Sequence, residues 1–408
     1  MHAKLARRMD WLRASDIREM LKVTQRPDMI SLAGGLPAPE IFPVAELAEA
    51  AARILRERGG IALQYATSEG HLPLREKIAA RMNRIYGTDF AAAEILVTTG
   101  SQQALDLTAK LFLDEGDAVL CESPTYLAAI QAFDVFHPRW VEVATDDDGM
   151  DPEALAAALA ANPQAKLVYV IPNSQNPSGR TWTLARRERF MEIVARHPVT
   201  VVEDNPYGEI CYDGEPLPSL ASLDRQGQVI CLGTFSKTVA PGLRVGWLAV
   251  HGPLFGKLTI LKGAADLHTS TFGQLVLDAY LEGGSLDANI LRTRTLYRER
   301  RDAMLAALAR EMPAGVRFTR PAGGLFIWLE LPAGLDARAL LPLCLERGVA
   351  FVPGGGFFPN GTREDTARLN FSNMPAERIV EGVRRLAEAM RELQARQATP
   401  GAAVTRGC

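Results

Sequence analysis

The 408-residue sequence has little that would place it in a membrane or in an oxidising compartment. It contains no apolar run of about 18 residues, the length that a membrane-spanning helix needs. The basic N-terminus, residues 1–10, is not followed by the apolar stretch of a secretory signal. The five cysteines are odd in number and form no Cys-x-x-Cys pair, so neither a disulfide framework nor a metal site is expected. We therefore predict a cytoplasmic protein that does not act at a membrane.

Neither sign of charge prevails in the sequence. The 45 basic and 48 acidic residues are well mixed and leave a net charge of -3. Without a basic patch, the sequence predicts no binding to nucleic acid or to an anionic membrane surface. Hydrophobic side chains make up 47% of the residues, enough for a large core and for two domains. The expected partners are small molecules.

Strand-like and helical segments alternate along the chain. The strand-like segments are residues 95–99, 118–121, 140–143, 166–171, 199–204, 229–232, 245–250, 324–331 and 367–372. Helices are predicted over residues 15–25, 43–57 with a stop at Gly59–Gly60, 72–86, 126–133, 152–159, 287–310 and 376–394, with another after Gly100. This alternation predicts an α/β fold with a mostly parallel, doubly wound sheet. Ligands bind beyond the carboxyl ends of the strands in such sheets, so polar residues there are candidates for a site.

The stretch from residue 233 to residue 247 carries the lysine to which we assign the chemistry. Lys237 follows one apolar run and precedes another, which places it at a sheet edge. Desolvation beside the fixed cation Arg244 lowers the pKa of a lysine, which then acts as an amine nucleophile toward a carbonyl. The hydroxyls of Thr234 and Ser236, together with Arg244, suit a phosphate. Taken alone, Lys237 is equally consistent with a solvated turn residue.

Several other strand ends carry polar or aromatic residues. Gly100, Ser101 and Gln102 open a helix after a short strand and would present free backbone N–H groups to a phosphate, although Ser101 also suits a simple N-cap. Each of the others has an ordinary explanation as a turn former or a half-buried aromatic. These are Tyr65, Tyr126, Asn176, Asp204 and Tyr207. Together with Lys237 and the two segments suited to a phosphate, these residues supply an aromatic face, an amide, a phenol, a carboxylate, two phosphate-binding turns and a lysine. Pyridoxal phosphate requires this set of groups.

With these residues assembled, the sequence resembles the pyridoxal-phosphate-dependent aminotransferases of fold type I, class I/II, in the branch of the 2-aminoadipate and kynurenine aminotransferases. The resemblance extends from about residue 18 to about residue 390. It rests on Ser-Leu-Ala-Gly-Gly-Leu-Pro (31–37), Thr-Gly-Ser-Gln-Gln-Ala-Leu-Asp-Leu (99–107), Asn-Pro-Ser-Gly (176–179), Glu-Asp-Asn-Pro-Tyr (203–207) and Phe-Ser-Lys-Thr-Val-Ala-Pro-Gly-Leu-Arg-Val-Gly (235–246). It implies a large domain with a mostly parallel seven-stranded sheet and a smaller α/β domain.

The resemblance also implies roles for individual residues. Lys237 binds the cofactor covalently and acts as general base. Asp204 pairs with the pyridine nitrogen, Tyr207 and Asn176 donate to the ring oxygen, and Tyr126 stacks on the ring. The phosphate is held by the segment of Gly100, Ser101 and Gln102, by Ser236 and Arg244, and has Thr234 nearby. Tyr65 reaches over from a partner subunit, so the protein is expected to be a homodimer with shared active sites.

The resemblance also implies which residues recognise the substrate. Arg368, in the segment 367–372, matches the arginine that grips the substrate α-carboxylate, with Asn176 beside it. Gly35 lies where backbone approaches the substrate, and Arg18 matches an arginine that meets the distal carboxylate of acidic substrates. Residues 173–175 and Asn205 depart from the family pattern, which leaves the range of substrates open.

We therefore predict an aminotransferase that moves an amino group between an L-amino acid and a 2-oxo acid such as 2-oxoglutarate. The amino acid is of the 2-aminoadipate, glutamate, aromatic or branched-chain type. The expected parts are an N-terminal arm with a mobile helix (1–42), a large cofactor-binding domain (43–290), a small domain (291–394) and a disordered tail (395–408).

Two other functions remain compatible with the fold. A lyase, a decarboxylase or a cyclopropane-forming synthase would use the same cofactor, but Arg368 with Arg18 and Gly35 favours transamination, because the bond held perpendicular to the ring is the one that breaks. A non-catalytic sensor, as in regulators that fuse this domain to a winged-helix DNA reader, is disfavoured by the short arm and by the lack of a basic recognition helix.

Overall fold

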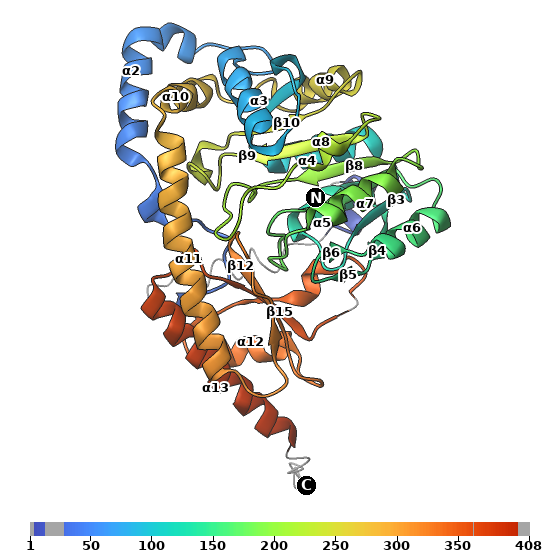
Figure 1. Ribbon diagram of the computed structural model, residues 1–408, viewed down its shortest axis with the longest axis vertical. Helices are drawn as coiled ribbons and strands as arrows, with labels where there is room; N and C mark the ends of the chain where they lie inside the picture. The colour runs from blue at the N-terminus through green and yellow to red at the C-terminus, as the bar shows by residue number, and fades with distance from the viewer. Residues whose placement is uncertain (1–3, 13–27, 362, 399–408) are drawn as a thin grey trace.

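A large mixed sheet forms the centre of the molecule, which is described here from a computed structural model covering residues 4–12, 28–361 and 363–398 (Figure 1). The strand order is β2-β10-β9-β8-β7-β3-β4. The strands are β2 (Ile95–Thr98), β3 (Ala118–Glu122), β4 (Arg139–Val143), β7 (Leu167–Val170), β8 (Thr200–Asp204), β9 (Val229–Thr234) and β10 (Gly246–Ala249). Only β10 runs antiparallel to its two neighbours, so the predicted mostly parallel seven-stranded sheet is confirmed.

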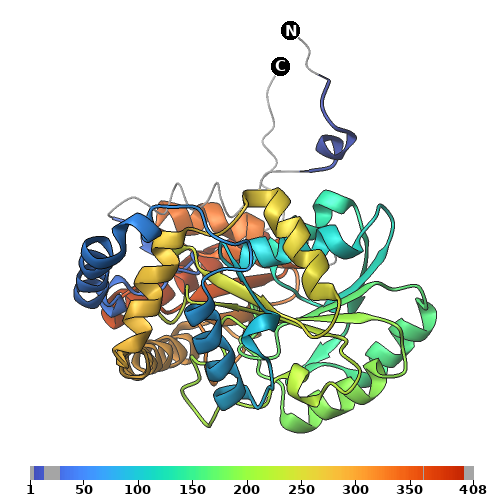
Figure 2. The same ribbon diagram turned by 90° about the horizontal axis from the view of Figure 1, so that it is seen from above.

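Helices cover both faces of this sheet (Figure 2), and the strand sequences show why. Along β7, Val168 belongs to one core cluster and Tyr169 to the other, because successive side chains point to opposite faces. Strands buried on both faces read as continuous apolar runs. One face packs α3 (Leu72–Tyr86), α6 (Pro152–Ala161), α7 (Leu184–Val194) and α8 (Leu220–Leu223); the other packs α4 (Ser101–Phe112), α5 (Leu127–Phe133) and α9 (Leu254–Asp266). A short hairpin, β5 (Thr145–Asp146) and β6 (Gly149–Met150), adjoins β4.

The C-terminal part builds a second core around an antiparallel sheet of order β11-β12-β15-β14. Its strands are β11 (Arg317–Phe318), β12 (Phe326–Glu330), β14 (Val352–Pro353) and β15 (Thr366–Asn370), covered by α12 (Ala337–Glu346) and α13 (Ala376–Ala398). The N-terminal strand β1 (Ile30–Ser31) joins this part by pairing in parallel with β13 (Val349–Ala350). The segment at β1 and the last helix, α13, therefore share one core.

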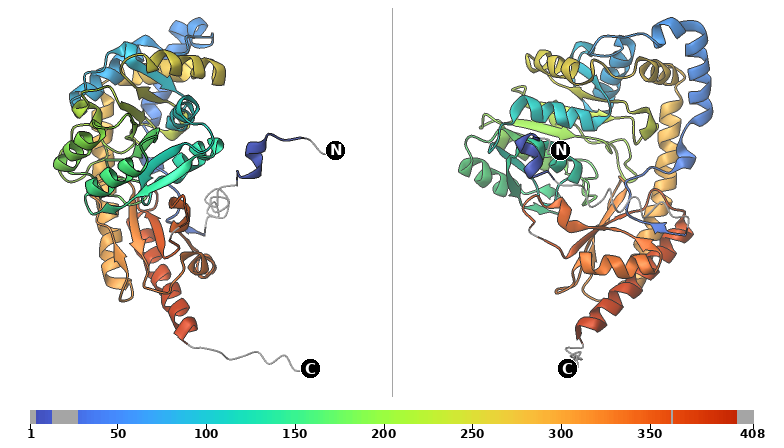
Figure 3. Two further views of the ribbon diagram at one scale, coloured as in Figure 1. Left: turned by 90° about the vertical axis from the view of Figure 1, so that its right-hand side faces the viewer. Right: turned by 180° about the vertical axis from the view of Figure 1, so that it is seen from behind.

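One long helix, α11 (Ser285–Glu311), connects the two cores (Figure 3). Its first turns place Leu286 and Ile290 in the core of the large sheet, and its later turns place Tyr297 and Met304 in the core of the small one. Beside its start, α2 (Val44–Ala62) packs on α10 (Thr271–Glu282) in a separate cluster. In the described ranges no helix combines the length and apolar character needed to cross a bilayer.

The elements predicted within the described residues are confirmed, most with boundaries within about two residues, and two helices extend further than predicted. The helix predicted over 72–86 has those bounds. The predicted stop at Gly59–Gly60 is wrong, because α2 continues to Ala62 past a single non-helical residue, Arg58 (φ -133°, ψ 19°). The last helix runs to Ala398 rather than to residue 394, since residues 395–398 are mostly good helix formers. The helix predicted over 15–25 lies outside the described residues.

Candidate active site

A cleft of about 370 Å³ opens beyond the carboxyl ends of the large sheet, between that sheet, the 34–36 loop and the small sheet. The predicted site residues come together here. Those that line it are Gly35, Ser101, Gln102, Tyr126, Asn176, Asp204, Tyr207, Thr234, Ser236, Lys237, Arg244 and Arg368. Gly35 and Arg368 are 333 residues apart in the sequence, so the fold brings distant segments together here.

Lys237 lies three residues after the end of β9, and its amine lines the cleft. Nζ donates a hydrogen bond to the carbonyl oxygen of Gly35 at 2.9 Å. Burial, followed by the positive charges of Arg368 and Arg244, lowers the pKa of Lys237 to about 8. A lysine in this state is far more often neutral at physiological pH than an ordinary one, and only the neutral amine attacks a carbonyl.

Asp204 ends β8 and is almost completely buried, at 1% exposure. Oδ2 accepts a hydrogen bond from the Tyr169 hydroxyl at 2.8 Å, whereas Oδ1 is buried and meets no donor among the residues that the structure describes. Burial raises the pKa of Asp204 to about 6. A buried carboxylate oxygen without a partner is costly, which indicates that a donor from a ligand completes it.

One end of the cleft is built for an anion. Helix α4 begins at Ser101, so its free N–H groups and the positive end of its dipole face this end. Gly100 has φ +74°, and a Cβ there would lie 2.3 Å from Arg244 Nη2, so the guanidinium packs directly against the helix start. The Thr234 hydroxyl donates to Ser236 Oγ at 2.8 Å, which orients the second hydroxyl. A guanidinium, hydroxyls and backbone N–H groups together suit a phosphate.

Arg368 lies on β15 and is buried, at 4% exposure. It donates from Nη1 to Asn176 Oδ1 and from Nη2 to the carbonyl of Ala33, each at 2.9 Å. Its guanidinium carbon lies 4.2 Å from the ring centroid of Phe326. Burial lowers the pKa of Arg368 to about 10, and within the described ranges no carboxylate pairs with it. A buried cation held only by neutral groups is a site for an anionic ligand group.

Two aromatic residues flank Lys237 and Asp204. Burial, followed by the charge of Asp204, raises the pKa of Tyr126 to about 12, and burial raises that of Tyr207 further. Both phenols therefore stay neutral and can donate hydrogen bonds across the physiological pH range. Tyr207 also meets Phe326 edge-to-face, with ring centroids 6.1 Å apart.

Two predicted residues lie outside the lining of the cleft, and a third is not described. Gly100 does not itself line the cleft but packs beneath Arg244, as described above. Tyr65 is 78% exposed and meets the ring of His268 edge-to-face, away from the cleft of its own chain. Arg18 lies outside the described residues.

The sequence did not single out Phe326 or Tyr169. Phe326 supports Arg368 from β12, and its apolar strand context resembled that of any core phenylalanine. Tyr169 reaches Asp204 from the neighbouring strand β7, where an apolar run concealed its hydroxyl. The apolar rim residues Leu36 and Leu127 also line the cleft. The one signal in the sequence was that Tyr169 lies in the strand that leads into the turn carrying Asn176.

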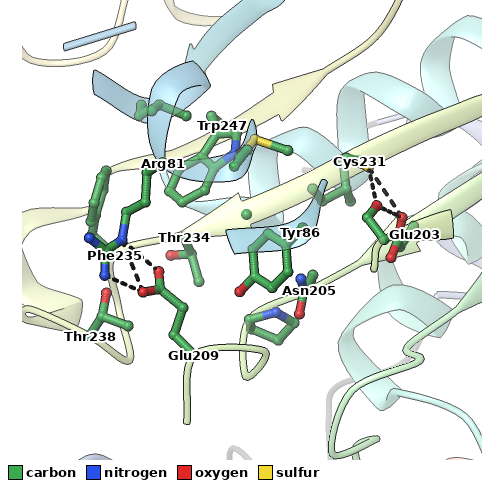
Figure 4. A pocket seen from close by; sticks show the side chains of 16 residues that line it. Arg81, Tyr86, Glu203, Asn205, Glu209, Cys231, Thr234, Phe235, Thr238 and Trp247 are labelled. Atoms are coloured by element: carbon green, nitrogen blue, oxygen red, sulfur yellow. Dashed lines mark hydrogen bonds and ion pairs between the residues drawn. The ribbon is translucent and has the colours of Figure 1, made fainter. Parts of the chain in front are cut away.

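A second, much smaller cavity of about 30 Å³ lies beside the first, behind the turn that carries Tyr207 (Figure 4). Asn205 Oδ1 accepts hydrogen bonds from Asn173 Nδ2 and from the backbone N–H of Gly208, both at 3.0 Å. Arg81 clamps Glu209 through its guanidinium. This space holds about one water molecule and no substrate, so it supports the turn rather than forming a site.

The fold and the cleft together define a class of protein. The family model for aminotransferases of class I and II matches residues 27–386, and the chain belongs to this family. It is 48% identical to the 2-aminoadipate transaminase of Thermus thermophilus, over 94% of this chain and 96% of that one. It is 45% identical to aromatic-amino-acid aminotransferase 1 of Thermococcus litoralis, over 93% of this chain and 92% of that one. The crystal structure of Pyrococcus horikoshii kynurenine aminotransferase, a complex with PMP, matches with a TM-score of 0.92 and 42% identity, over 95% of this chain and 97% of that one.

The protein is therefore a pyridoxal-phosphate-dependent aminotransferase of fold type I, as the sequence predicted. The cleft also fits this cofactor on physical grounds. An amine with a lowered pKa is present for the aldehyde, and Asp204 Oδ1 needs the donor that a protonated pyridine nitrogen offers. The start of α4 with Arg244 is ready for the phosphate. Of these groups, the buried Asp204 Oδ1 is the one that lacks a hydrogen-bond partner among the residues that the structure describes.

Proposed function

We propose that the protein transfers the amino group of an L-amino acid of the 2-aminoadipate, glutamate, aromatic or branched-chain type to a 2-oxo acid such as 2-oxoglutarate. The observation that carries this proposal is the placement of Arg368. Its buried guanidinium, which has no acidic partner among the described residues, lines the same cleft as the Lys237 amine and the unpartnered Oδ1 of Asp204. This arrangement suits a molecule that carries both an α-carboxylate and an α-amino group.

Arg368 and Lys237 would have different roles in the reaction. Arg368 would grip the α-carboxylate with its guanidinium fork and so orient the Cα–H bond. Lys237 Nζ, neutral above pH about 8, would take the proton from Cα and return it at the other reacting carbon. Pyridoxal phosphate, when bound, supplies an aldehyde for the amino group and a ring that takes up the electrons released at Cα.

The other predicted residues would hold and tune the cofactor. Asp204 Oδ1 would keep the proton on the pyridine nitrogen, and Tyr207 and Asn176 would donate to the ring oxygen. The proximity of Asn176 to Arg368, 2.9 Å between Oδ1 and Nη1, lets the same amide serve the substrate side. Tyr126 would stack on the ring, and Ser101, Gln102, Ser236, Arg244 and the Gly100 turn would hold the phosphate, with Thr234 orienting Ser236.

The substrate side chain would leave the cleft past the 34–36 loop. This rim combines the apolar side chains of Leu36 and Leu127 with the amide of Gln131. A residue with a side chain at position 35 would crowd this space, because its Cβ would lie 3.0 Å from the Phe326 ring; Gly35 leaves the space open. Such a rim suits aromatic and long aliphatic side chains, and Arg18 would add a charge for acidic ones. The relatives named for aromatic amino acids and for 2-aminoadipate are in keeping with this range.

We also propose the assembly, the domain division and the location of the protein. A second copy would cover the exposed apolar residues Ile61, Leu63 and Tyr65 and bring Tyr65 to the phosphate end of the neighbouring cleft.

For the domains, residues 43–290 would form the cofactor domain, and residues 291–394 would form the small domain together with the arm, since the core changes along α11. The free thiols of Cys121 and Cys231 support a reducing, cytoplasmic location.

The test is the absorbance of the purified protein with bound cofactor, mixed with single L-amino acids in the absence of any oxo acid. We expect conversion of the cofactor to its amino form, and the fastest donor identifies the substrate class. Recovery of the first spectrum on adding 2-oxoglutarate would complete the cycle. Release of ammonia or carbon dioxide without a stable amino form would instead identify a lyase or a decarboxylase, and no spectral change with any donor would contradict the proposal.

A further inference from the structure

Tyr169 is a fully buried tyrosine that lies outside the cleft but touches its central carboxylate. It sits on β7, next to the parallel strand β8 that ends at Asp204. Its hydroxyl donates to Asp204 Oδ2 at 2.8 Å. The strand pairing and an edge-to-face contact with Phe133, at 5.8 Å between centroids, fix the ring. The hydroxyl therefore cannot follow the carboxyl group if that group rotates.

The contact divides the two oxygens of the carboxylate between two tasks. Oδ2 is occupied by Tyr169, which leaves Oδ1, the buried oxygen without a partner, as the one available to a ligand. The ionisable groups that act on Asp204 and its donor are the phenols of Tyr126 and Tyr207 and the buried Glu122. None of these three groups hydrogen-bonds to the carboxylate, whereas Tyr169 does; it is the one side-chain donor to Asp204 among the described residues.

We propose that Tyr169 is a positioning residue for the cofactor: its hydroxyl holds the Asp204 carboxylate in the ionised form with Oδ1 directed at the pyridine nitrogen. The hydrogen bond stabilises the charged carboxylate, because a donor favours the form that accepts it. Without it, both oxygens of a buried carboxylate would lack a partner, and the group would take up a proton instead. A protonated Asp204 no longer stabilises a proton on the pyridine ring. This inference rests on the proposed role of Asp204.

The test compares two ligands on the full-length apoprotein: pyridoxal phosphate and its analogue in which CH replaces the ring nitrogen. We expect Tyr169→Phe to weaken binding of pyridoxal phosphate by about tenfold or more, the size of one charge-assisted hydrogen bond. Binding of the analogue should change by less than about twofold, because the analogue makes no bond to Asp204 Oδ1. The ratio of the two affinities therefore isolates the path through the ring nitrogen.

Two further variants separate the possible failures. Tyr212→Phe is the matched control, because Tyr212 is also buried and its hydroxyl donates to the Gly324 carbonyl, away from Asp204. It should leave the affinity ratio unchanged. Asp204→Asn should abolish the preference for pyridoxal phosphate; if it does not, the proposed role of Asp204 itself is wrong. Suppose instead that Asp204→Asn abolishes the preference, but Tyr169→Phe weakens the binding of both ligands equally or leaves both affinities unchanged. Tyr169 is then a structural residue, and the inference is overturned.

A second measurement covers the case in which Tyr169→Phe does not fold. Fluorotyrosine at position 169 keeps the hydroxyl and makes it a stronger donor. The affinity ratio should then shift toward pyridoxal phosphate, and the pH below which the preference is lost should fall. An unchanged ratio and an unchanged pH midpoint would contradict the proposal.

Discussion

Lys237 is the residue whose protonation decides whether the cofactor can attach. Its pKa is lowered to about 8 by burial and by Arg368 and Arg244. In the unfolded chain the amine keeps its ordinary, higher pKa. Between the two values the unfolded chain binds more protons, so this group makes the apoprotein more stable as the pH rises through that interval.

We predict that the rate of cofactor attachment to the apoprotein rises about tenfold per pH unit below pH about 8 and levels off above it. Arg368→Gln removes one positive neighbour, so the midpoint should move to higher pH. Rapid mixing with absorbance detection measures both. A midpoint near that of an ordinary lysine, or one unaffected by Arg368→Gln, would show that the cleft does not tune this amine.

Arg368 should not be replaceable by lysine. We predict that Arg368→Lys lowers kcat/KM for amino acid substrates by about a hundredfold, because one ammonium cannot form the two parallel bonds of a guanidinium. Steady-state kinetics with the best donor measures the loss. Arg363→Lys is the matched control, since Arg363 lies nearby in sequence but is partly exposed and paired with Asp365. Equal activity of the two variants would argue against carboxylate binding at Arg368.

The sequence predicted the strand-end residues of the site but not the residues behind them. Asp204, Asn176 and Lys237 stand out because each lies at the end of an apolar run or in the polar segment that follows one. Tyr169 has no such pattern, and its partner lies 35 residues away, so only the pairing of β7 with β8 reveals the contact. The roles of these residues remain predictions until the variants above are measured.

At the scale of elements, helix α2 shows a local signal that acts only in part. A pair of glycines usually ends a helix, and α2 does kink at Arg58, directly before Gly59 and Gly60, yet it resumes to Ala62, which is buried against α10. Helix α3 was predicted with its bounds because a left-handed glycine, Gly87 at φ +71°, ends it and nothing beyond extends it. The order of the strands and the antiparallel β10 could not be predicted, since strand partners are set by contacts distant in sequence.

Gly59 is a position where this helix can be strengthened. We predict that Gly59→Ala raises the free energy of unfolding by about 0.5–1 kcal/mol, because alanine loses less backbone entropy on folding. A Cβ there meets no atom within 4 Å. Gly100→Ala is the contrast: with φ +74° and a Cβ 2.3 Å from Arg244, it should destabilise the protein and weaken cofactor binding. Denaturant unfolding measures the stability of both variants, and a cofactor titration measures the binding to Gly100→Ala. A loss of stability in Gly59→Ala would contradict the prediction.

At the scale of the whole molecule, our proposal that the exposed Tyr65 serves the partner's cleft means that no single copy holds a complete site. We predict that Lys237→Ala and Tyr65→Ala subunits, each impaired as homodimers, recover activity when co-expressed with different tags and purified as the mixed dimer. One of its two clefts would then combine an intact Lys237 with an intact Tyr65, which gives about half the wild-type activity per dimer.

The control for this experiment pairs Lys237→Ala with Tyr207→Ala. Tyr207 lines the same cleft as the Lys237 of its own chain, so every cleft of that mixed dimer carries a defect. No recovery is expected. Recovery in the control, or none in the Tyr65 pairing, would show that the sites are not shared as proposed.

The two arginines of the cleft also bear on how the protein should be handled. Arg244 and Arg368 both line the cleft, and inorganic phosphate or sulfate has the geometry that guanidinium groups bind. Phosphate buffer or ammonium sulfate will therefore compete with cofactor and substrate, and Tris will consume the aldehyde. A zwitterionic sulfonate buffer with chloride as the only added anion is the medium in which true affinities for this cleft will emerge.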